Sequence, residues 1–127
     1  MPDTLTFLHT ATPLAVAFDE LIAEVAPELP ARHLIAPDLL DTARTHGADA
    51  QETREAVQAA ARNAVDGGAR VVLCTCSTIG DPAERADAGS VVMRVDRPMA
   101  ARAVEAGSRV LVVATLQSTI GPTTDLI

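Results

Sequence analysis

The sequence predicts an α/β protein: an open, mostly parallel sheet of four to five strands with helices on both faces, giving three layers. Short runs rich in β-branched residues alternate with segments of helical periodicity, which is the pattern of βαβ units. The chain has 127 residues, of which 48% are hydrophobic, enough for one compact core and too few for two ordinary ones. We therefore expect one α/β domain over residues 1–114, with a C-terminal tail or the start of a missing second domain over 115–127.

The first part of the chain divides into two strands, each followed by a helix. A strand is expected at Leu5–His9, and the helix after it, over 14–25, repeats apolar residues at the spacing of one helical face. A weaker strand at Arg32–Ile35 precedes a short helix near Asp38–Thr45, which Gly47 should end. These segments supply the first βαβ unit.

Acidic residues mark the expected starts of the next two helices. Asp49 and Glu52 have the spacing of a capping box, so a helix should begin there. A strand at Val71–Thr75 follows it. Asp81, with proline next to it, should cap another helix after a turn at 77–80. The alternation of strand and helix therefore continues through the middle of the chain.

Two more strands are expected near the C-terminus, at Val91–Val95 and Arg109–Ala114, with a helix between them that ends at Gly107. Residues 121–125 have the composition of the opening turn of a helix. A useful helix needs about three turns, so we expect an element that is begun and not completed, as in a truncated protein. An ordinary frayed tail is the alternative.

Charge and composition exclude several classes of function. The net charge is −7 and all ten basic residues are scattered arginines, so nucleic-acid binding is not expected. Without lysine the chain can build neither a Walker-type phosphate loop nor a Schiff base with pyridoxal phosphate. Phe7 and Phe18 are the only aromatic residues, too few to stack a flavin or a nucleobase. We expect no organic cofactor.

The location of the protein is also constrained. No apolar run is long enough to span a bilayer, and Met1–Thr4 has no basic region ahead of an apolar stretch, so neither a membrane segment nor a secretory signal is expected. Cys74 and Cys76 have the spacing of neither a disulfide framework nor a zinc site, so no metal is expected. Free thiols fit a reducing cytosol, and we expect a cytoplasmic protein.

Three expected loops that follow strand ends are rich in serine and threonine: residues 9–12, 76–80 and 115–119. In an open parallel sheet, ligands bind outside the carboxyl ends of the strands, where loops and helix N-termini converge. Short hydroxyls and free N–H groups there suit a small carboxylate. The same residue types also serve as turn and capping residues, so each hydroxyl taken alone has a structural interpretation as well.

The two cysteines have different expected environments. A thiol at a strand end beside a helix N-terminus has its thiolate favoured by the helix dipole, so Cys76 is the candidate base or nucleophile. Cys74 should point to the same face one pleat deeper and act as an inert core thiol. From the residues alone, a functional and a structural role for Cys76 stay equally open.

The segment from Leu73 to Pro82 delivers Cys76 from a strand into a Ser/Thr-rich turn followed by Asp-Pro at a helix start. This arrangement is similar to the first catalytic-cysteine motif of hydantoin racemases. Three later segments are similar to the link between the two domains of such enzymes: residues 95–99, 103–107 and 109–115. On these motifs the sequence resembles the aspartate/glutamate/hydantoin racemase superfamily, and the resemblance spans nearly the whole chain.

The resemblance implies a cofactor-independent isomerase, or a piece of one. Members have two similar α/β domains across a cleft, each with one cysteine; one thiolate removes the α-proton and the other thiol returns a proton to the opposite face. Cys76 matches the first-domain cysteine. The implied contacts of a small carboxylate or amino-acid-like substrate are hydroxyl residues at the cleft: Thr10, Ser77, Thr78, Thr115, Ser118 and Thr119. Related chemistries, maleate isomerisation and arylmalonate decarboxylation, stay open.

The sequence departs from that pattern because both cysteines lie on one strand, about 7 Å apart by strand rise, and cannot flank a substrate. The second acid–base group would come from a missing half-domain, a second copy in a homodimer, or His9. His33 and His46 are expected in loops or at the surface. The alternative function is a catalytically silent anion-binding or interaction domain. A thiol redox protein is disfavoured because Cys74 and Cys76 lack disulfide geometry.

Overall fold

The computed structural model describes residues 4–127; Met1, Pro2 and Asp3, which entered the expectation about a secretory signal, lie outside the described residues. Four parallel strands form one sheet in the order β2-β1-β3-β4. The strands are β1 (Thr4–His9), β2 (Ala31–Ile35), β3 (Ala69–Cys74) and β4 (Val91–Arg94). The predicted α/β class with a parallel sheet is confirmed.

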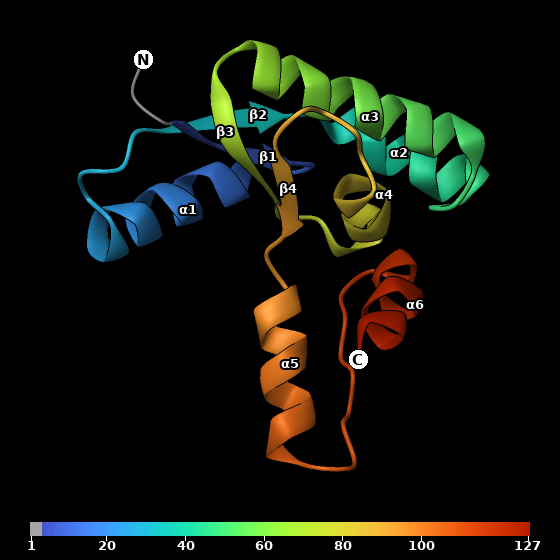
Figure 1. Cartoon of the computed structure of the whole chain (residues 1–127). Coiled ribbons are helices and arrows are strands. Elements are labelled where there is room, and N and C mark those ends of the chain that lie inside the picture. Colours follow the sequence, from blue (N-terminus) through green and yellow to red (C-terminus); the bar gives the residue numbers. More distant parts are fainter. Residues whose placement is uncertain (1–3) are drawn as a thin grey trace.

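The helices cover both faces of this sheet. They are α1 (Thr12–Val25), α2 (Pro37–His46), α3 (Gln51–Asp66), α4 (Gly80–Glu84), α5 (Arg97–Ala106) and α6 (Gln117–Leu126), with a short 3-10 turn, η1 (Ser77–Ile79). The chain moves one way across the sheet from β1 to β2 and the other way from β2 to β3. Because parallel crossovers are right-handed, this reversal sends α1 and α3 to opposite faces, as Figure 1 shows. None of the helices in the described part is long and apolar enough to cross a membrane.

The main core lies between the sheet and the α2–α3 layer. Leu8 of β1, Val72 of β3, Val57 of α3 and Ile79 of η1 are fully buried there. All six residues of β1 are buried, since this central strand has a neighbouring strand on each side and helices on each face. The core therefore fixes the position of the carboxyl ends of β1 and β3.

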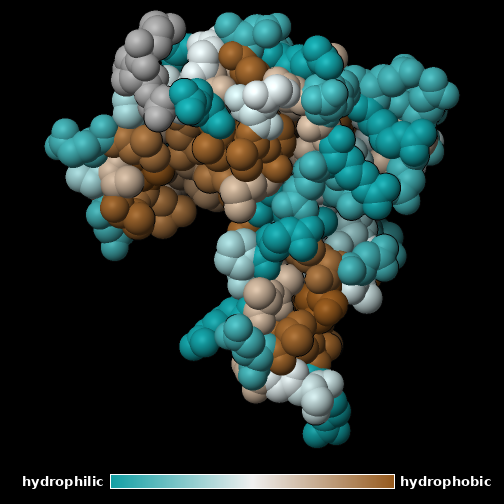
Figure 2. All heavy atoms as spheres, viewed as in Figure 1, coloured by the Kyte–Doolittle hydropathy of each residue, from teal (hydrophilic) through white to brown (hydrophobic). Residues whose placement is uncertain are grey.

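The other face of the sheet is covered less completely. Helix α1 has no fully buried residue, and it meets the sheet where Phe18 packs on Phe7 with ring centroids 4.9 Å apart. Val16 and Val25 remain largely exposed on α1. Figure 2 shows apolar surface gathered along this helix and the neighbouring part of the sheet.

The expected fifth strand at Arg109–Ala114 is wrong. Helix α5 leads the chain away from the sheet, and residues 107–116 return as an irregular segment along it, so the two form a projecting arm (Figure 1). Leu111 and Val113 on this segment are 87% and 84% exposed. A β-prone segment forms a strand only where a partner strand offers a ladder, and no strand within residues 4–127 pairs with the arm.

Two expected caps and one helix boundary are also wrong. Neither Asp49 nor Asp81 caps a helix: α3 begins after Ala50 without a side-chain cap, and Asp81 lies inside the first turn of α4. The C-terminal element is a ten-residue helix that begins at Gln117, not an opening turn, and it contains Pro122. Its position is set by contacts with η1, which the sequence pattern does not display.

Truncation of the buried Leu8 tests this account of the core. Leu8→Ala should lower the free energy of unfolding by about 2–5 kcal/mol, because it removes a fully buried side chain between packed layers. Urea unfolding followed by circular dichroism measures the effect. Arg62→Ala, at an exposed position of α3, is the control and should change stability by less than about 0.5 kcal/mol. Equal losses in the two variants would contradict the assignment of the core.

Candidate functional site

The carboxyl ends of β1 and β3 lie side by side where the strand order reverses. The backbone N–H of Thr75, directly after β3, donates to the carbonyl of Leu8 in β1 at 3.0 Å. Ligands of open α/β sheets bind in the crevice outside such a switch point. The segments that meet here are His9-Thr10 and Thr75-Cys76, so two of the three expected loops converge.

The two cysteines differ as the sequence predicts. Cys74 is 1% exposed in the main core, and burial raises the pKa of its thiol to about 12. Its Sγ–H donates to the Cys76 carbonyl at 3.5 Å, which leaves the deeper thiol protonated and occupied. Cys76 is partly exposed at the end of the strand, and both thiols are free. Of the two sulfur atoms, the one at Cys76 is within reach of a ligand.

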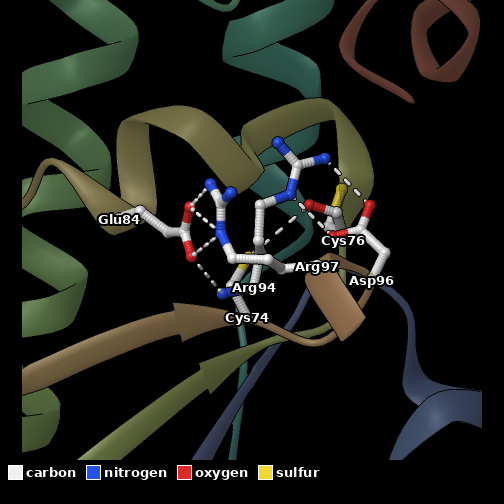
Figure 3. A network of polar contacts seen from close by, with 6 residues as sticks. All are labelled: Cys74, Cys76, Glu84, Arg94, Asp96 and Arg97. Atoms are coloured by element: carbon white, nitrogen blue, oxygen red, sulfur yellow. Dashed lines mark hydrogen bonds and ion pairs between the residues drawn. The ribbon is translucent and has the colours of Figure 1, made fainter. Parts of the chain in front are cut away.

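A buried ion pair closes the neighbouring end of β4. Arg94 is 3% exposed, and its Nε and Nη2 donate to the two oxygens of Asp96 at 2.6 and 2.8 Å (Figure 3). Burial by itself raises the pKa of the Asp96 carboxyl, but hydrogen bonds from Arg94 and Ser77 outweigh it and hold the pKa below the usual value. Asp96 therefore stays ionised and fixes Ser77, the residue after Cys76.

A second pair joins α4 to the start of α5. Arg97 Nε donates to both carboxylate oxygens of Glu84 at 3.0 Å, and the hydrogen bonds from Arg97 are the main cause of the lowered Glu84 pKa. Glu84 also accepts the Arg94 backbone N–H at 3.3 Å. The guanidinium of Arg94 packs directly over Gly80, where an added Cβ would come within 2.6 Å of it. The turn after Cys76 is thus held between paired charges.

A network of hydrogen-bonded side chains lies near the same edge on the α1 face. Thr75 Oγ1 is 2.8 Å from His9 Nδ1, and His9 Nε2 is 2.8 Å from His33 Nδ1. His33 Nε2 is 2.7 Å from the Asp19 carboxylate on α1. His9 is completely buried, and the two imidazoles stack with centroids 5.1 Å apart. We call these four residues the histidine network.

The expectation that His33 is a loop or surface residue is therefore wrong. It lies in β2 opposite Phe7, in the register that pairs β1 with β2, and its ring stacks on Phe7 at 5.3 Å. Alternation along β1 puts Phe7 and His9 on one face, a signal that was present in the sequence. The register between β1 and β2, which adds His33 to that face, has no signal in the sequence.

The structure brings together some of the expected substrate-binding hydroxyls and uses them internally. Thr78 Oγ1 donates to the Ser118 carbonyl at 3.2 Å, with the Ser118 hydroxyl 3.3 Å away. That carbonyl belongs to the residue four before Pro122, which has no N–H to offer it. Thr78 therefore satisfies a group that the proline leaves unpaired and ties α6 to η1.

The remaining expected hydroxyls have separate surroundings. Thr10 is buried directly after β1 near the switch point, and Ser77 is bonded to Asp96. Thr115 is exposed on the arm, and the Thr119 backbone N–H donates to Leu116 within the start of α6. Only Thr10 and Ser77 of this set are placed beside the carboxyl ends of β1 and β3 with no tie to α6.

Two open cavities of about 470 Å³ lie between α6, η1 and the α2–α3 connection. Both are lined by Thr78, Ala48 and Pro122, and the more enclosed one also reaches Arg94. Cys76 lines neither of them. The more enclosed of the two cavities is also lined by Arg85, which is paired with Asp81 at 3.0 Å. These cavities adjoin the cysteine turn without containing its thiol.

Sequence reasoning had no direct signal for the charged residues of the site. Arg94 sits at an inward position of an alternating strand, Val91-Val92-Met93-Arg94, and an inward arginine requires a carboxylate partner. That rule could have indicated Asp96 two residues later.

Comparisons with protein-family models, with curated proteins and with solved structures found no match to this chain. The resemblance to the racemase superfamily stays an expectation that rests on the motifs around Cys76.

The buried imidazole of His9 should make folding sensitive to mild acid. Burial, then the neighbouring His33, lowers the pKa of His9 in the folded state, against roughly 6.5 in an unfolded chain. The unfolded chain therefore binds the proton more readily, so this stability is fully present above pH 6.5 and is lost as the pH falls through the folded pKa. Melting temperatures measured from pH 7.5 to 5 should fall, and less so in His9→Gln. A parallel fall in both proteins would contradict the assignment.

Proposed function

We propose that this protein is a cofactor-independent isomerase of the amino-acid racemase type, in which the Cys76 thiolate transfers an α-proton on a small carboxylate substrate. The observation that carries the proposal is the contrast between the two thiols. Cys74 is buried with its pKa raised to about 12, whereas Cys76 is partly exposed at the switch point of the sheet. That is the location where open α/β sheets bind ligands.

The surroundings of Cys76 support proton transfer on a carbon next to a carbonyl group. The thiolate would take the α-proton while the electron pair moves into that carbonyl. Thr10 is the hydroxyl best placed to bind the substrate carboxylate, because the Ser77 hydroxyl already donates its proton to Asp96. Thr78 and Ser118 act instead as the tie between η1 and α6. The arginines near the turn are paired with carboxylates, so the binding would rely on hydroxyls and backbone N–H groups.

Two further aspects of the proposal follow from the thiols and from the arm. A thiolate base must stay reduced, which agrees with two free cysteines and with a cytoplasmic location.

The arm carries exposed apolar side chains, among them Met99, Val104 and Leu111. Its exposed basic residues, Arg102 and Arg109, complement the acidic residues of the incompletely covered α1. We infer that the arm of one copy covers α1 of a second copy.

Self-association through the arm can be measured directly. Size-exclusion chromatography with light scattering at high protein concentration should give a dimer, because exposed apolar patches of this kind favour burial. Leu111→Glu should shift the protein to a monomer. Ala59→Glu, at an exposed position of α3 away from the arm, is the matched control and should leave the dimer intact. A monomer for the unmodified chain would contradict the dimer. It would favour a separate half-domain as the partner that covers α1.

The isomerase proposal is tested by α-proton exchange in deuterated water, followed by NMR. The probes are both enantiomers of aspartate, glutamate and 5-methylhydantoin. Cys76→Ala should lower exchange of a probe that reacts by about a hundredfold or more, the usual range for loss of an acid–base group. Cys74→Ala, which removes the buried thiol, is the control and should retain exchange in the folded fraction. Retained exchange in Cys76→Ala would overturn the proposal, and carboxylate binding without exchange in the unmodified protein would favour a silent binding domain.

A further inference from the structure

The histidine network ends next to Cys76, on the opposite face of the sheet. Successive side chains of an extended segment point to opposite faces, and Cys76 is extended, with φ −106° and ψ 114°. Its thiol packs against the main core on the α3 face, whereas Thr75 bonds to His9 on the α1 face. These two neighbouring side chains therefore flank the switch point of the sheet from two sides.

The hydrogen bonds of the network are compatible with a single direction of donation when both histidines are neutral. Each imidazole then has one donor and one acceptor nitrogen. Thr75 donates to His9 Nδ1, His9 Nε2–H donates to His33 Nδ1, and His33 Nε2–H donates to Asp19. Each of the four imidazole nitrogens has a partner in this arrangement.

The same contacts also accommodate one additional proton. A protonated His33 donates at Nδ1 to His9 and at Nε2 to Asp19, and His9 in turn donates at Nδ1 to Thr75. The Thr75 hydroxyl proton then turns to the carbonyl of Leu8, 3.3 Å away. His9 is fully buried, whereas His33 bonds to the Asp19 carboxylate, which is 68% exposed to solvent. The network can thus hold one additional proton and connect it by hydrogen bonds to a hydroxyl at the sheet edge.

We propose that the Thr75 hydroxyl is the second acid–base group of the reaction, supplied through His9 with a proton that His33 holds beside Asp19. This inference rests on the isomerase activity proposed for Cys76. It assigns within one chain the group that the second cysteine provides in two-domain enzymes. Thr75 would be the catalytic residue, and His9, His33 and Asp19 would act through it.

The proton transfers balance. The Cys76 thiolate forms an S–H bond as the Cα–H bond breaks, and the electron pair moves into the adjacent carbonyl. The carbanion then takes the Thr75 hydroxyl proton on the opposite face, Thr75 takes the Nδ1 proton of His9, and His9 takes the Nδ1 proton of His33. Neutral His33 keeps its Nε2 proton on Asp19. The substrate leaves inverted. Once the substrate has left, the Cys76 thiol gives its proton to water and water gives one to the Thr75 oxygen. The Thr75 proton then passes to His9 Nδ1 and the His9 Nε2 proton to His33 Nδ1, which restores the starting state.

Removal of the hydroxyl separates proton removal from inversion. Thr75→Val keeps the shape of the side chain and eliminates the donor, while Thr75→Ser retains the hydroxyl. In deuterated water, Thr75→Val should still exchange the α-proton of the one enantiomer that Cys76 deprotonates, but inversion should fall by roughly a hundredfold or more. Thr75→Ser should restore inversion. A purely structural role for the hydroxyl would lower exchange and inversion together.

A surface variant tests the outer end of the network with little risk to folding. Asp19→Asn removes the carboxylate that holds His33, and it should slow inversion of the probe more than it slows exchange. Glu52→Gln, which changes an exposed carboxylate on α3 instead of α1, is the matched control and should change neither rate. Both rates are measured on the same aspartate, glutamate and 5-methylhydantoin enantiomers.

The outcomes distinguish this inference from the isomerase proposal. No exchange in the unmodified protein would remove the activity itself. Exchange that depends on Cys76, together with unchanged inversion in Thr75→Val, would overturn the role of Thr75 and leave the activity standing. Loss of inversion in Thr75→Val with normal rates in Asp19→Asn would keep Thr75 and exclude the supply through His33.

Discussion

The parallel pairing of β1 with β3 is the constraint on which the rest of the structure depends. These strands are far apart in sequence, and their alignment ends with the Thr75 N–H bonded to the Leu8 carbonyl. Because both strands end at this bond, His9 and Cys76 are brought to one edge of the sheet. The fully buried Leu8 and Val72 hold the two strands in that alignment from the side of the main core. The packing of the core therefore also sets the geometry of the candidate site.

The two faces of the sheet carry different chemistry at that edge. On the α3 face, paired charges surround the cysteine turn, and the Arg94–Asp96 pair is buried, so its cost in desolvation is met by close contacts between both nitrogens and both oxygens. On the α1 face, two imidazoles stack on each other and on Phe7 and are joined by hydrogen bonds. One face thus fixes a turn by charge, while the other provides a path along which a proton can move.

The arm and α6 show how strongly context governs the C-terminal part of the chain. Residues 109–114 have strong β propensity and yet lie exposed, because α5 carries them away from the edge of β4. Pro122 lies inside α6, where it leaves the Ser118 carbonyl without its helical partner, and Thr78 supplies the missing hydrogen bond. Both features follow from contacts made between segments distant in sequence.

The sequence by itself determined the α/β class, the four strands that form the sheet and the difference between Cys74 and Cys76. These depend on hydrophobic periodicity and on alternation along a strand, which are local properties. The tertiary structure alone decided that His33 joins His9 and Thr75, that Asp96 neutralises Arg94, and that residues 109–114 form no strand. Strand register, the partner of a buried charge and the availability of a neighbouring strand are set by segments distant in the chain. For the same reason, Cys76 could be singled out from sequence, whereas the groups that surround it could not.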